Sequence, residues 1–328
     1  MRVLITGGAG FIGSHLAEAY LSQGDEVYII DDLSTGTLNN INQLKENHSY
    51  KKRLFVHIDT ILNRDIMLEL IGTCDVIHHM AAAVGVRYIL DHPMESINTN
   101  IQGTECVLEL CNKFKKRVLI ASTSEVYGKH LHAPLVESDN IIYGPSIKFR
   151  WSYAASKLMD EFMALAYFRT TGLKVTVVRL FNTVGPRQTG TYGMVIPRFV
   201  SQALKNEPVT VYGDGSQTRT FTYVKDVVWA LKKLIENEQS FGRVFNIGGT
   251  EEVSIINLAR RIVDAANSSS EIKLVPYHVA FGKDFEDMQR RVPSIEKLRG
   301  LIGFEPKTPL DAILTEVIAF MSKRTNNI

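Results

Sequence analysis

Met1-Arg-Val-Leu-Ile-Thr6 runs into Gly7-Gly-Ala-Gly10-Phe-Ile-Gly13, and Val27-Tyr-Ile-Ile-Asp31-Asp32 follows after a short intervening segment. The first and last of these runs are apolar and rich in branched residues, which is typical of buried strands. Residues 14–23 are amphipathic and begin directly after the glycine turn, and Gly24 ends them. Strand, turn, helix and strand together predict one βαβ unit.

The glycine turn has the features of a dinucleotide site. Glycines at 7, 10 and 13 clear side chains from the path of a pyrophosphate, and the following helix N-terminus offers N–H donors and partial positive charge. Asp31 ends the second strand, where its carboxylate can accept hydrogen bonds from ribose hydroxyls. A 2′-phosphate would be repelled there, so the pattern predicts NAD; the alternative is a tight turn without a ligand. The glycine spacing resembles that of short-chain dehydrogenase/reductases.

Composition narrows the class of protein. The chain has 328 residues, 45% hydrophobic and 22% charged, with a net charge of +2, as in ordinary soluble globular proteins. This balance gives no electrostatic reason to expect nucleic acid or a membrane surface as a partner. Cys74, Cys106 and Cys111 lack metal-ligand spacing, so we expect reduced core cysteines and no metal. With no signal pattern and no membrane-spanning run, we expect a cytoplasmic protein.

Apolar runs alternate with helical patterns as far as Leu180. This alternation predicts an α/β fold, a doubly wound parallel Rossmann sheet that binds NAD over residues 1–180. The pattern loosens afterwards, which predicts a smaller mixed α/β lobe for the substrate over 181–328. Segments near 220–250 are expected to return to the first domain, including a strand at 244–247.

Tyr153 and Lys157 stand four residues apart on a helix predicted over 153–170, so they share a face. A nearby ammonium stabilises a phenolate and brings the pKa of a tyrosine towards the working range of a base. The buried strand at 117–121 delivers Ser122 and Thr123 at its carboxyl end, where a doubly wound sheet places its chemistry. By chance alone such a Tyr-Lys pair is common on solvated helices, but the glycine turn upstream favours catalysis.

Over nearly its whole length the chain resembles the extended short-chain dehydrogenase/reductases that modify nucleotide sugars. The resemblance implies that Tyr153 deprotonates a sugar hydroxyl, Lys157 assists it, and Thr123 holds the C4 oxygen. It also implies hydride transfer from C4 to NAD and a 4-keto sugar, which is then epimerised, dehydrated or decarboxylated. Asp59 either touches the adenine or caps a strand end. The expected NAD contacts are Gly7, Gly10, Phe11, Ile12, Gly13, Asp31, Asp32, Asp59, Thr60, Ala81, Ala82, Ser122, Tyr153 and Lys157.

The C-terminal half contains segments similar to the family's nucleotide-binding segments. The resemblance places Asn182 and Arg219 at the diphosphate and Tyr212 near the base, and the planar fork of arginine suits phosphate. The alternative is that Arg198 and Arg219 form surface ion pairs. The expected substrate contacts are Arg87, Ser124, Asn182, Val195, Arg198, Tyr212, Arg219 and Arg291.

Glu125 bears on the outcome of the reaction. Thr123-Ser124-Glu125 is similar to UDP-glucuronate decarboxylases and GDP-mannose 4,6-dehydratases, whereas 4-epimerases usually carry a small or neutral residue at the third position. Glu125 is expected to handle a proton at C5 or to hold the sugar, unless it only caps a loop. Arg150-Trp-Ser-Tyr153 and Arg290-Arg-Val-Pro-Ser-Ile295 resemble the decarboxylases, whose catalytic arginine falls on Arg291, or on Arg290 if the register shifts.

The leading prediction is therefore a UDP-glucuronate decarboxylase that forms UDP-4-keto-pentose or UDP-xylose. Residues 83–87 and 187–190 are closer to 4-epimerases, so a UDP-glucuronate or UDP-glucose 4-epimerase is the alternative, ahead of a 4,6-dehydratase. A non-catalytic NAD sensor is disfavoured because Thr123, Tyr153 and Lys157 are all present. By resemblance, we expect a homodimer formed through the helices at 98–113 and 153–170.

Overall fold

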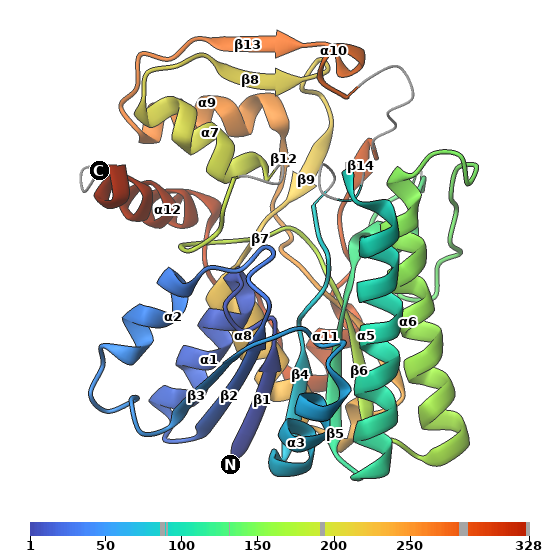
Figure 1. Ribbon diagram of the computed structural model, residues 1–328. Coiled ribbons are helices and arrows are strands. Elements are labelled where there is room, and N and C mark those ends of the chain that lie inside the picture. Colours follow the sequence, from blue (N-terminus) through green and yellow to red (C-terminus); the bar gives the residue numbers. More distant parts are fainter. Residues whose placement is uncertain (86–88, 90, 131, 191–193, 282–287, 326–328) are drawn as a thin grey trace.

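The computed structural model describes residues 1–85, 89, 91–130, 132–190, 194–281 and 288–325 (Figure 1). Its centre is a seven-stranded sheet in which every neighbouring pair of strands is parallel. In order across the sheet, the strands are β11 (Arg243–Ile247), β6 (Val175–Leu180), β5 (Arg117–Thr123), β4 (Val76–His79), β1 (Arg2–Thr6), β2 (Glu26–Asp31) and β3 (Leu54–Ile58). The predicted doubly wound α/β fold is confirmed.

Helices cover both faces of this sheet, and the alternation along β1 shows how. Val3 and Ile5 pack with α1 and α8, whereas Leu4 belongs to a second core with α3, α5 and α6. Both faces of the sheet are therefore buried, which is why the strand sequences are continuous apolar runs. The helices around the sheet are α1 (Phe11–Ser22), α2 (Leu38–Lys45), α3 (Arg64–Thr73), α5 (Pro93–Lys113), α6 (Arg150–Thr171), α8 (Val224–Glu236) and α11 (Glu296–Ile302).

A smaller lobe stands above the carboxyl ends of the strands (Figure 1). Its strands form short sheets that carry residues towards the main sheet: β8 (Val209–Tyr212) with β13 (Ile272–Val275), β9 (Thr218–Thr220) between β12 (Glu252–Ser254) and β14 (Arg290–Arg291), and β7 (Thr183–Val184) with β10 (Thr222–Tyr223). Its helices are α7 (Val195–Leu204), α9 (Ile255–Ala265), α10 (Tyr277–Phe281) and α12 (Leu310–Thr325). The described residues also form the 3-10 turns η1 (Ser124–Tyr127) and η2 (Glu238–Ser240).

Two helices begin earlier than the apolar spacing predicts. α5 starts at Pro93, and proline suits the first helical position because its missing N–H would have no partner there. α6 starts at Arg150, which brings Arg150 onto the same helix as Tyr153. The first turns of both helices mix polar and apolar residues, so the hydrophobic period does not reveal them. Among the described residues, none of the helices has the length and apolarity needed to cross a membrane.

Candidate active site

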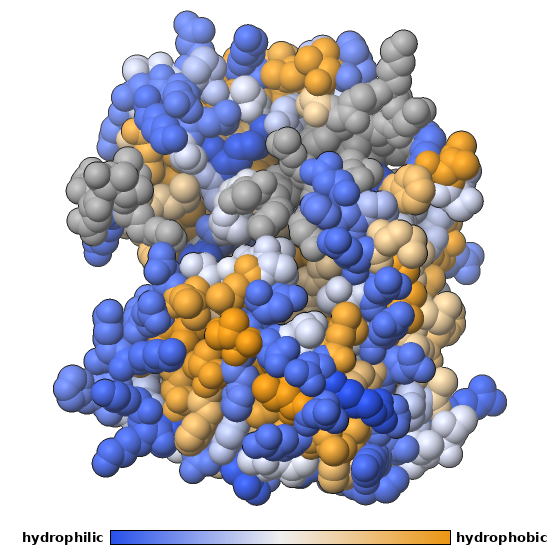
Figure 2. All heavy atoms as spheres, in the orientation of Figure 1, coloured by the Kyte–Doolittle hydropathy of each residue, from blue (hydrophilic) through white to orange (hydrophobic). Residues whose placement is uncertain are grey.

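A cleft of about 980 Å³ lies between the carboxyl ends of the sheet and the C-terminal lobe. Its wall combines the glycine turn, the ends of β4, β5 and β6, and residues of α7, β8 and β14. In the space-filling view the outline narrows at the left, between the sheet-bearing part and the lobe (Figure 2). The cleft is therefore built from both halves of the chain.

The glycine turn leaves room for a ligand at one end of this cleft. Gly7 has φ +68°, and a Cβ there would lie 2.8 Å from the backbone of Ala81. A Cβ on Gly13 would overlap the carbonyl of Gly7. Gly10 is the N-cap of α1 and has no side chain to accept from the first N–H groups of the helix, and the residues of this first turn line the cleft. This arrangement fits the pyrophosphate of a dinucleotide.

Asp31 is held in place beside the turn. Its Oδ2 accepts the N–H of Ala9 at 2.9 Å and its Oδ1 accepts the N–H of Leu33 at 2.8 Å. Burial raises the pKa of this carboxyl, and the two N–H groups oppose that shift. A carboxylate has four acceptor positions, so ribose hydroxyls can still bind. The residues present fit NAD.

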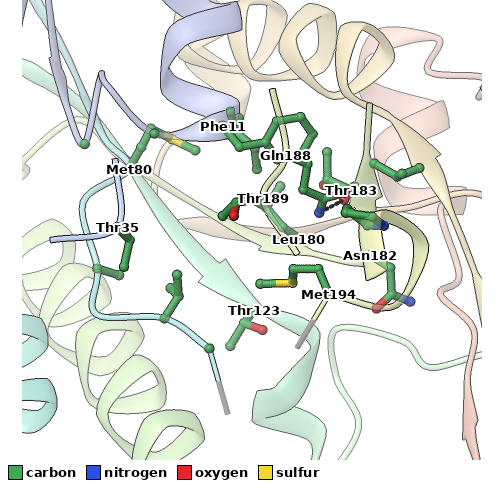
Figure 3. A pocket seen from close by; sticks show the side chains of 18 of the residues that line it. Phe11, Thr35, Met80, Thr123, Leu180, Asn182, Thr183, Gln188, Thr189 and Met194 are labelled. Carbon is green, nitrogen blue, oxygen red and sulfur yellow. Dashed lines mark hydrogen bonds between the residues drawn. The ribbon is translucent and has the colours of Figure 1, made fainter. Parts of the chain in front are cut away.

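The middle of the cleft carries the polar groups of the predicted reaction centre. Figure 3 shows Thr35 and Met80 on one side, Asn182 on the other, and Thr123 and Met194 between them. The Nε2 of Gln188 donates to the carbonyl of Thr183 at 3.0 Å and fixes the loop that follows β7 (Figure 3). Thr123 therefore lies between the Thr35 side and the Asn182 side of the cleft (Figure 3).

Tyr153 lines the cleft from the first turns of α6. The sequence predicts a lowered pKa for this phenol, and the structure shows the opposite. Burial, together with the charges of Glu125 and Asp160, raises the pKa of Tyr153, while the Thr123 hydroxyl opposes the shift. Lys157 lies one turn further on and its Nζ is 2.7 Å from Oδ2 of Asp160, with both side chains buried. The ammonium is therefore already neutralised in part by a carboxylate.

Glu125 is the centre of a charge cluster at the cleft, the Glu125 cluster, which also contains the buried Arg291 and Arg150. Its Oε1 is 2.6 Å from Arg291 Nη2, and its Oε2 accepts a hydrogen bond from Arg150 Nη2 at 3.3 Å. Burial alone would raise the pKa of Glu125, but Arg291, Arg150 and Arg219 hold it at about 2. Glu125 therefore stays ionised at neutral pH. This favours the expected holding role over the proton-handling role.

The side chain that caps η1 is that of Thr123. The Oγ1 of Thr123 accepts the N–H of Glu125 at 3.2 Å, so Thr123 caps η1. The two arginines of β14 are separated by strand alternation. Arg291 is buried and lines the cleft, whereas Arg290 is exposed and forms an ion pair with Glu252 at 2.7 Å. The structure thus brings Arg291 to the site.

The nucleotide-binding residues expected in the C-terminal half lie along the same wall. The guanidinium of Arg198 stacks 4.0 Å from the ring centroid of Tyr212. Asn182 donates to the carbonyl of Thr220 at 2.9 Å, and Arg219 donates to that of Thr218 at 2.8 Å. These interactions orient the residues, and both arginines line the cleft, where Arg219 is buried. Ser124 and Val195 also line the cleft.

Other predicted contacts are placed differently. Thr60 and Lys157 are described but do not form part of the cleft wall. Asp59 borders the cleft and also accepts hydrogen bonds from the Thr60 N–H at 2.7 Å and from Asn63 at 2.8 Å, so it does cap the strand end. Arg87 lies outside the described residues. The expected residues that do line the wall are Gly7, Gly10, Phe11, Ile12, Gly13, Asp31, Asp32, Ala81, Ala82 and Ser122.

Sequence reasoning missed two polar residues near the centre. Asp160 holds Lys157, and its position three residues later on one helix was the available signal. Asn100 accepts the N–H of Ala83 at 2.8 Å and donates to Ser156 at 3.1 Å, which ties the loop after β4 to α6. No pattern in the sequence pointed to Asn100. In the part of the chain that the structure describes, no group of three or more His, Cys, Asp or Glu side chains could hold a metal.

Comparisons with known proteins agree with this geometry. Residues 4–317 match the sequence model of the family described as GDP-mannose 4,6 dehydratase. The chain is 41% identical to the UDP-N-acetyl-alpha-D-glucosaminuronate decarboxylase of Bacillus cytotoxicus, over 99% of both chains. It is 36% identical to UDP-glucuronic acid decarboxylase 1 of Danio rerio, over 98% of this chain and 73% of that protein.

Solved structures are also similar. UDP-glucuronic acid 4-epimerase from Bacillus cereus, in complex with UDP-glucuronic acid and NAD, superposes with a TM-score of 0.88 at 29% identity, covering 99% of this chain and 100% of that one. The dTDP-glucose 4,6-dehydratase from Bacillus anthracis, in complex with NAD, gives a TM-score of 0.86 at 26% identity, covering 99% and 98%. One architecture therefore serves more than one reaction, and the side chains must separate them.

Proposed function

The chain belongs to the GDP-mannose 4,6 dehydratase family of extended short-chain dehydrogenase/reductases, and we propose that it is an NAD-dependent decarboxylase of a UDP-linked uronate. The observation that carries the proposal is the Glu125 cluster. Two guanidinium groups meet one carboxylate at the cleft, beside Thr123 and Tyr153, so the cluster keeps a net positive charge. A sugar carboxylate is the group that such a charge would bind.

The reaction follows from what each side chain can do. The glycine turn and Asp31 would hold NAD, which would supply the hydride acceptor for C4 of the sugar. Tyr153 takes the proton of the C4 hydroxyl as C4 is oxidised to the ketone, and the Thr123 hydroxyl hydrogen-bonds the C4 oxygen. The product of this step is a β-keto acid, because the carboxylate at C6 is attached to C5, next to the new ketone.

Loss of carbon dioxide breaks the C5–C6 bond and leaves its electron pair as an enolate on the C4 oxygen. Donors fixed around that oxygen stabilise it. Once Tyr153 has taken the C4 proton it is a neutral phenol, which can donate to the enolate oxygen, and its raised pKa favours this protonated form. Arg291 would orient the departing carboxylate, and Glu125 would hold Arg291 in place. A proton from solvent then completes C5.

Two substrates satisfy this chemistry: UDP-glucuronate and its 2-acetamido analogue, on which the 41% identical relative acts. We propose UDP-linked glucuronates as the class. The purified protein should be incubated with NAD and each sugar, with carbon dioxide and the UDP product measured. Release of carbon dioxide with a UDP-4-keto-pentose or a UDP-pentose is expected. Formation of UDP-galacturonate, with the carboxylate retained, would show that the protein is a 4-epimerase and not a decarboxylase. Turnover of UDP-glucose alone would contradict the proposed uronate substrate.

Tyr153→Phe tests the acid–base role. Loss of the phenolic proton should lower turnover by about 10² or more, with NAD affinity nearly unchanged. Lys157→Met should act similarly and should also weaken NAD binding. Loss of fold and NAD binding together in Tyr153→Phe would instead indicate a packing role.

We also propose that the protein is a homodimer that works in the cytoplasm. α5 and α6 lie side by side on one flank of the molecule (Figure 1), and Phe162 on α6 is 60% exposed. Burial of this apolar ring in a partner copy would explain its position. Light scattering should show a dimer that Phe162→Glu dissociates, with Val279→Glu as a control at another exposed apolar residue. A monomer at micromolar concentration would contradict the proposal.

A further inference from the structure

A loop that runs from Lys129 to Ile142 leaves η1 and returns to it, and the structure describes all of this 129–142 loop except residue 131. The N–H of Lys129 donates to the carbonyl of Ile142 at 2.7 Å, and the N–H of Ile142 donates to that of Tyr127 at 3.3 Å. Tyr127 ends η1, the turn that carries Glu125. The two ends of the loop are therefore fixed beside one member of the Glu125 cluster.

The middle of the loop bonds the chain that follows β14. The N–H of Leu135 donates to the carbonyl of Val292 at 2.8 Å, and its carbonyl accepts the N–H of Ser294 at 2.7 Å. Val292 directly follows Arg291, whose Nη2 lies 2.6 Å from Oε1 of Glu125. The loop is thus bonded to the chain on both sides of this ion pair, so its shape affects where the two charges meet.

Three hydrogen bonds cross the loop and join its two arms. The Nε2 of His130 bonds the carbonyl of Asn140, and its Nδ1 lies 3.2 Å from Nδ1 of His132. The Nε2 of His132 lies in turn 3.2 Å from Oδ2 of Asp139. His130 is buried and the side chain of Asp139 is 14% exposed, whereas that of His132 is 58% exposed. We call His130, His132 and Asp139 the histidine bridge.

The histidine bridge requires three hydrogens on two imidazole rings. A carbonyl and a carboxylate oxygen only accept, so both Nε2 atoms must carry a hydrogen. The two Nδ1 atoms face each other, and a hydrogen bond between them needs a hydrogen on one of the two. Two neutral imidazoles have one N–H each, which makes two, so the third hydrogen is an extra proton and gives the pair a positive charge. Loss of that proton breaks one of the three bonds.

Asp139 is the charged group that bonds the rings, and its negative charge offsets the extra positive one. On the loop itself, the ammonium of Lys129 lies 5.9 Å from the centroid of the Trp151 ring, and Glu137 accepts the N–H of Asn246 at 2.8 Å. Charged groups of the elements packed against the loop bond partners outside the histidine bridge: Arg291 and Arg150 bond Glu125, Arg179 bonds Glu161, and Lys297 bonds the carbonyl of Val244.

We propose that the histidine bridge is a pH-sensitive device that positions Arg291 for the sugar carboxylate. While His130 and His132 share one extra proton, the bridge holds the 129–142 loop, and the loop holds the ion pair of Glu125 and Arg291. Neither histidine forms part of the cleft wall, so both are positioning residues that act through the loop. The inference rests on the proposed function, because it takes Arg291 as the carboxylate ligand. Decarboxylation should therefore weaken as rising pH removes the shared proton.

Imidazole NMR tests the shared proton without any sugar. With isotope-labelled histidine and NAD bound, the rings of His130 and His132 should lose one proton between them from pH 6 to 9, and both sets of resonances should move in that single step. In His132→Ala, the resonances of His130 should no longer follow that step. The control is His48, an exposed ring whose Nδ1 lies 3.3 Å from the carbonyl of Glu46, and its titration should be the same in both proteins. Independent titrations of His130 and His132, with that of His130 unchanged in His132→Ala, would overturn the proposal.

Hydrogen exchange tests whether the bridge affects the chain beside Arg291. The N–H of Ser294 donates to the loop, so its exchange at pH 6 should be about fivefold faster in His132→Ala than in the native protein, which is the scale of a single hydrogen bond. His48→Ala should leave this exchange unchanged. Equal exchange at Ser294 in His132→Ala and the native protein would overturn the link from the histidines to Arg291. Neither experiment uses sugar, so both remain decisive even if UDP-uronates are not decarboxylated.

The pH profile of the reaction separates positioning from a merely structural role. For the preferred UDP-uronate, kcat/KM of the native protein should exceed that of His132→Ala about fivefold at pH 6 and should approach it at pH 9, where the shared proton is lost. His132→Arg offers N–H donors to both His130 and Asp139 that do not titrate, so it should keep at pH 9 the advantage over His132→Ala that the native protein loses. A ratio of native to His132→Ala activity that is the same at both pH values would overturn the proposal.

Discussion

Glu125 and Glu161 are both carboxylates bound by arginine, but Glu161 is buried whereas Glu125 is partly exposed. Glu161 is enclosed: Arg179 lies 2.7 Å away, Ser122 donates at 2.5 Å, and the guanidinium of Arg179 stacks 4.7 Å from the ring centroid of Tyr127. Glu125 instead opens on the cleft, and the buried Nε of its partner Arg291 has no hydrogen-bond partner among the described residues. The polar groups of the Glu161 group thus bond one another, whereas the Glu125 cluster keeps an unpaired N–H donor on Arg291.

The difference separates stability from function. A buried polar cluster whose members satisfy one another rigidifies the core, and an incomplete one is where a ligand is expected. The Glu161 group joins α6 to β5 and β6, and its ion pair of Glu161 and Arg179 is not part of the cleft wall, so we assign the pair to the fold. The Glu125 cluster joins η1, α6 and β14 around the cleft, so we assign it to the substrate. Variants in each cluster should therefore change different measurements.

Arg291→Met is expected to have the largest effect. It removes the donor proposed for the sugar carboxylate and leaves Glu125 with less compensation, at a cost of about 4 kcal/mol in the transition state. Carbon dioxide release from the preferred UDP-uronate should fall about 10³-fold, while NAD affinity stays near native. Native turnover in this variant would show that the sugar carboxylate binds elsewhere. It would also contradict the assignment of the Glu125 cluster, but not the Glu161 group, to the substrate.

The cofactor end of the cleft could be predicted because its residues follow one another closely in the sequence. A glycine turn, a helix start and a strand-end acid lie within the first 32 residues, and each has a local physical reason. The Glu125 cluster could not be predicted as a cluster, because Glu125, Arg150 and Arg291 meet only through tertiary packing. Resemblance named the residues, but not the ion pairs that keep Glu125 charged. The domain boundary at residue 180 remains a prediction.

Glu161→Gln should destabilise the protein without changing its chemistry. Breaking the enclosed pair leaves Arg179 buried and uncompensated, at about 3 kcal/mol of unfolding free energy. Denaturant unfolding should show this loss, while turnover per folded molecule stays within about twofold of native. A selective fall in turnover, with stability retained, would mean that the Glu161 group is catalytic after all.

Glu125→Gln should reveal a pH-dependent contribution of the open cluster to stability. The folded pKa of Glu125, about 2, lies below its ordinary value of 4.5, so its charged form favours the folded state. This contribution is complete above pH 4.5 and is lost as the pH falls towards 2. After allowance for its partial exposure, it amounts to about 2 kcal/mol. Unfolding free energies at pH 5 and pH 3 should converge for native and variant, and parallel curves would contradict the charged state.

Arg290→Met should have the smallest effect, and it is the matched control for Arg291→Met. The two arginines are neighbours on β14, so they point to opposite faces of the strand. Arg290 pairs with Glu252 at 2.7 Å on the surface, where its side chain is 45% exposed. An exposed ion pair contributes about 1 kcal/mol or less. Stability should therefore change by less than that, and carbon dioxide release should stay within about twofold of native. A large loss in Arg290→Met with a small one in Arg291→Met would show that the working register of β14 is shifted by one residue, which would exchange the two side chains between solvent and cleft.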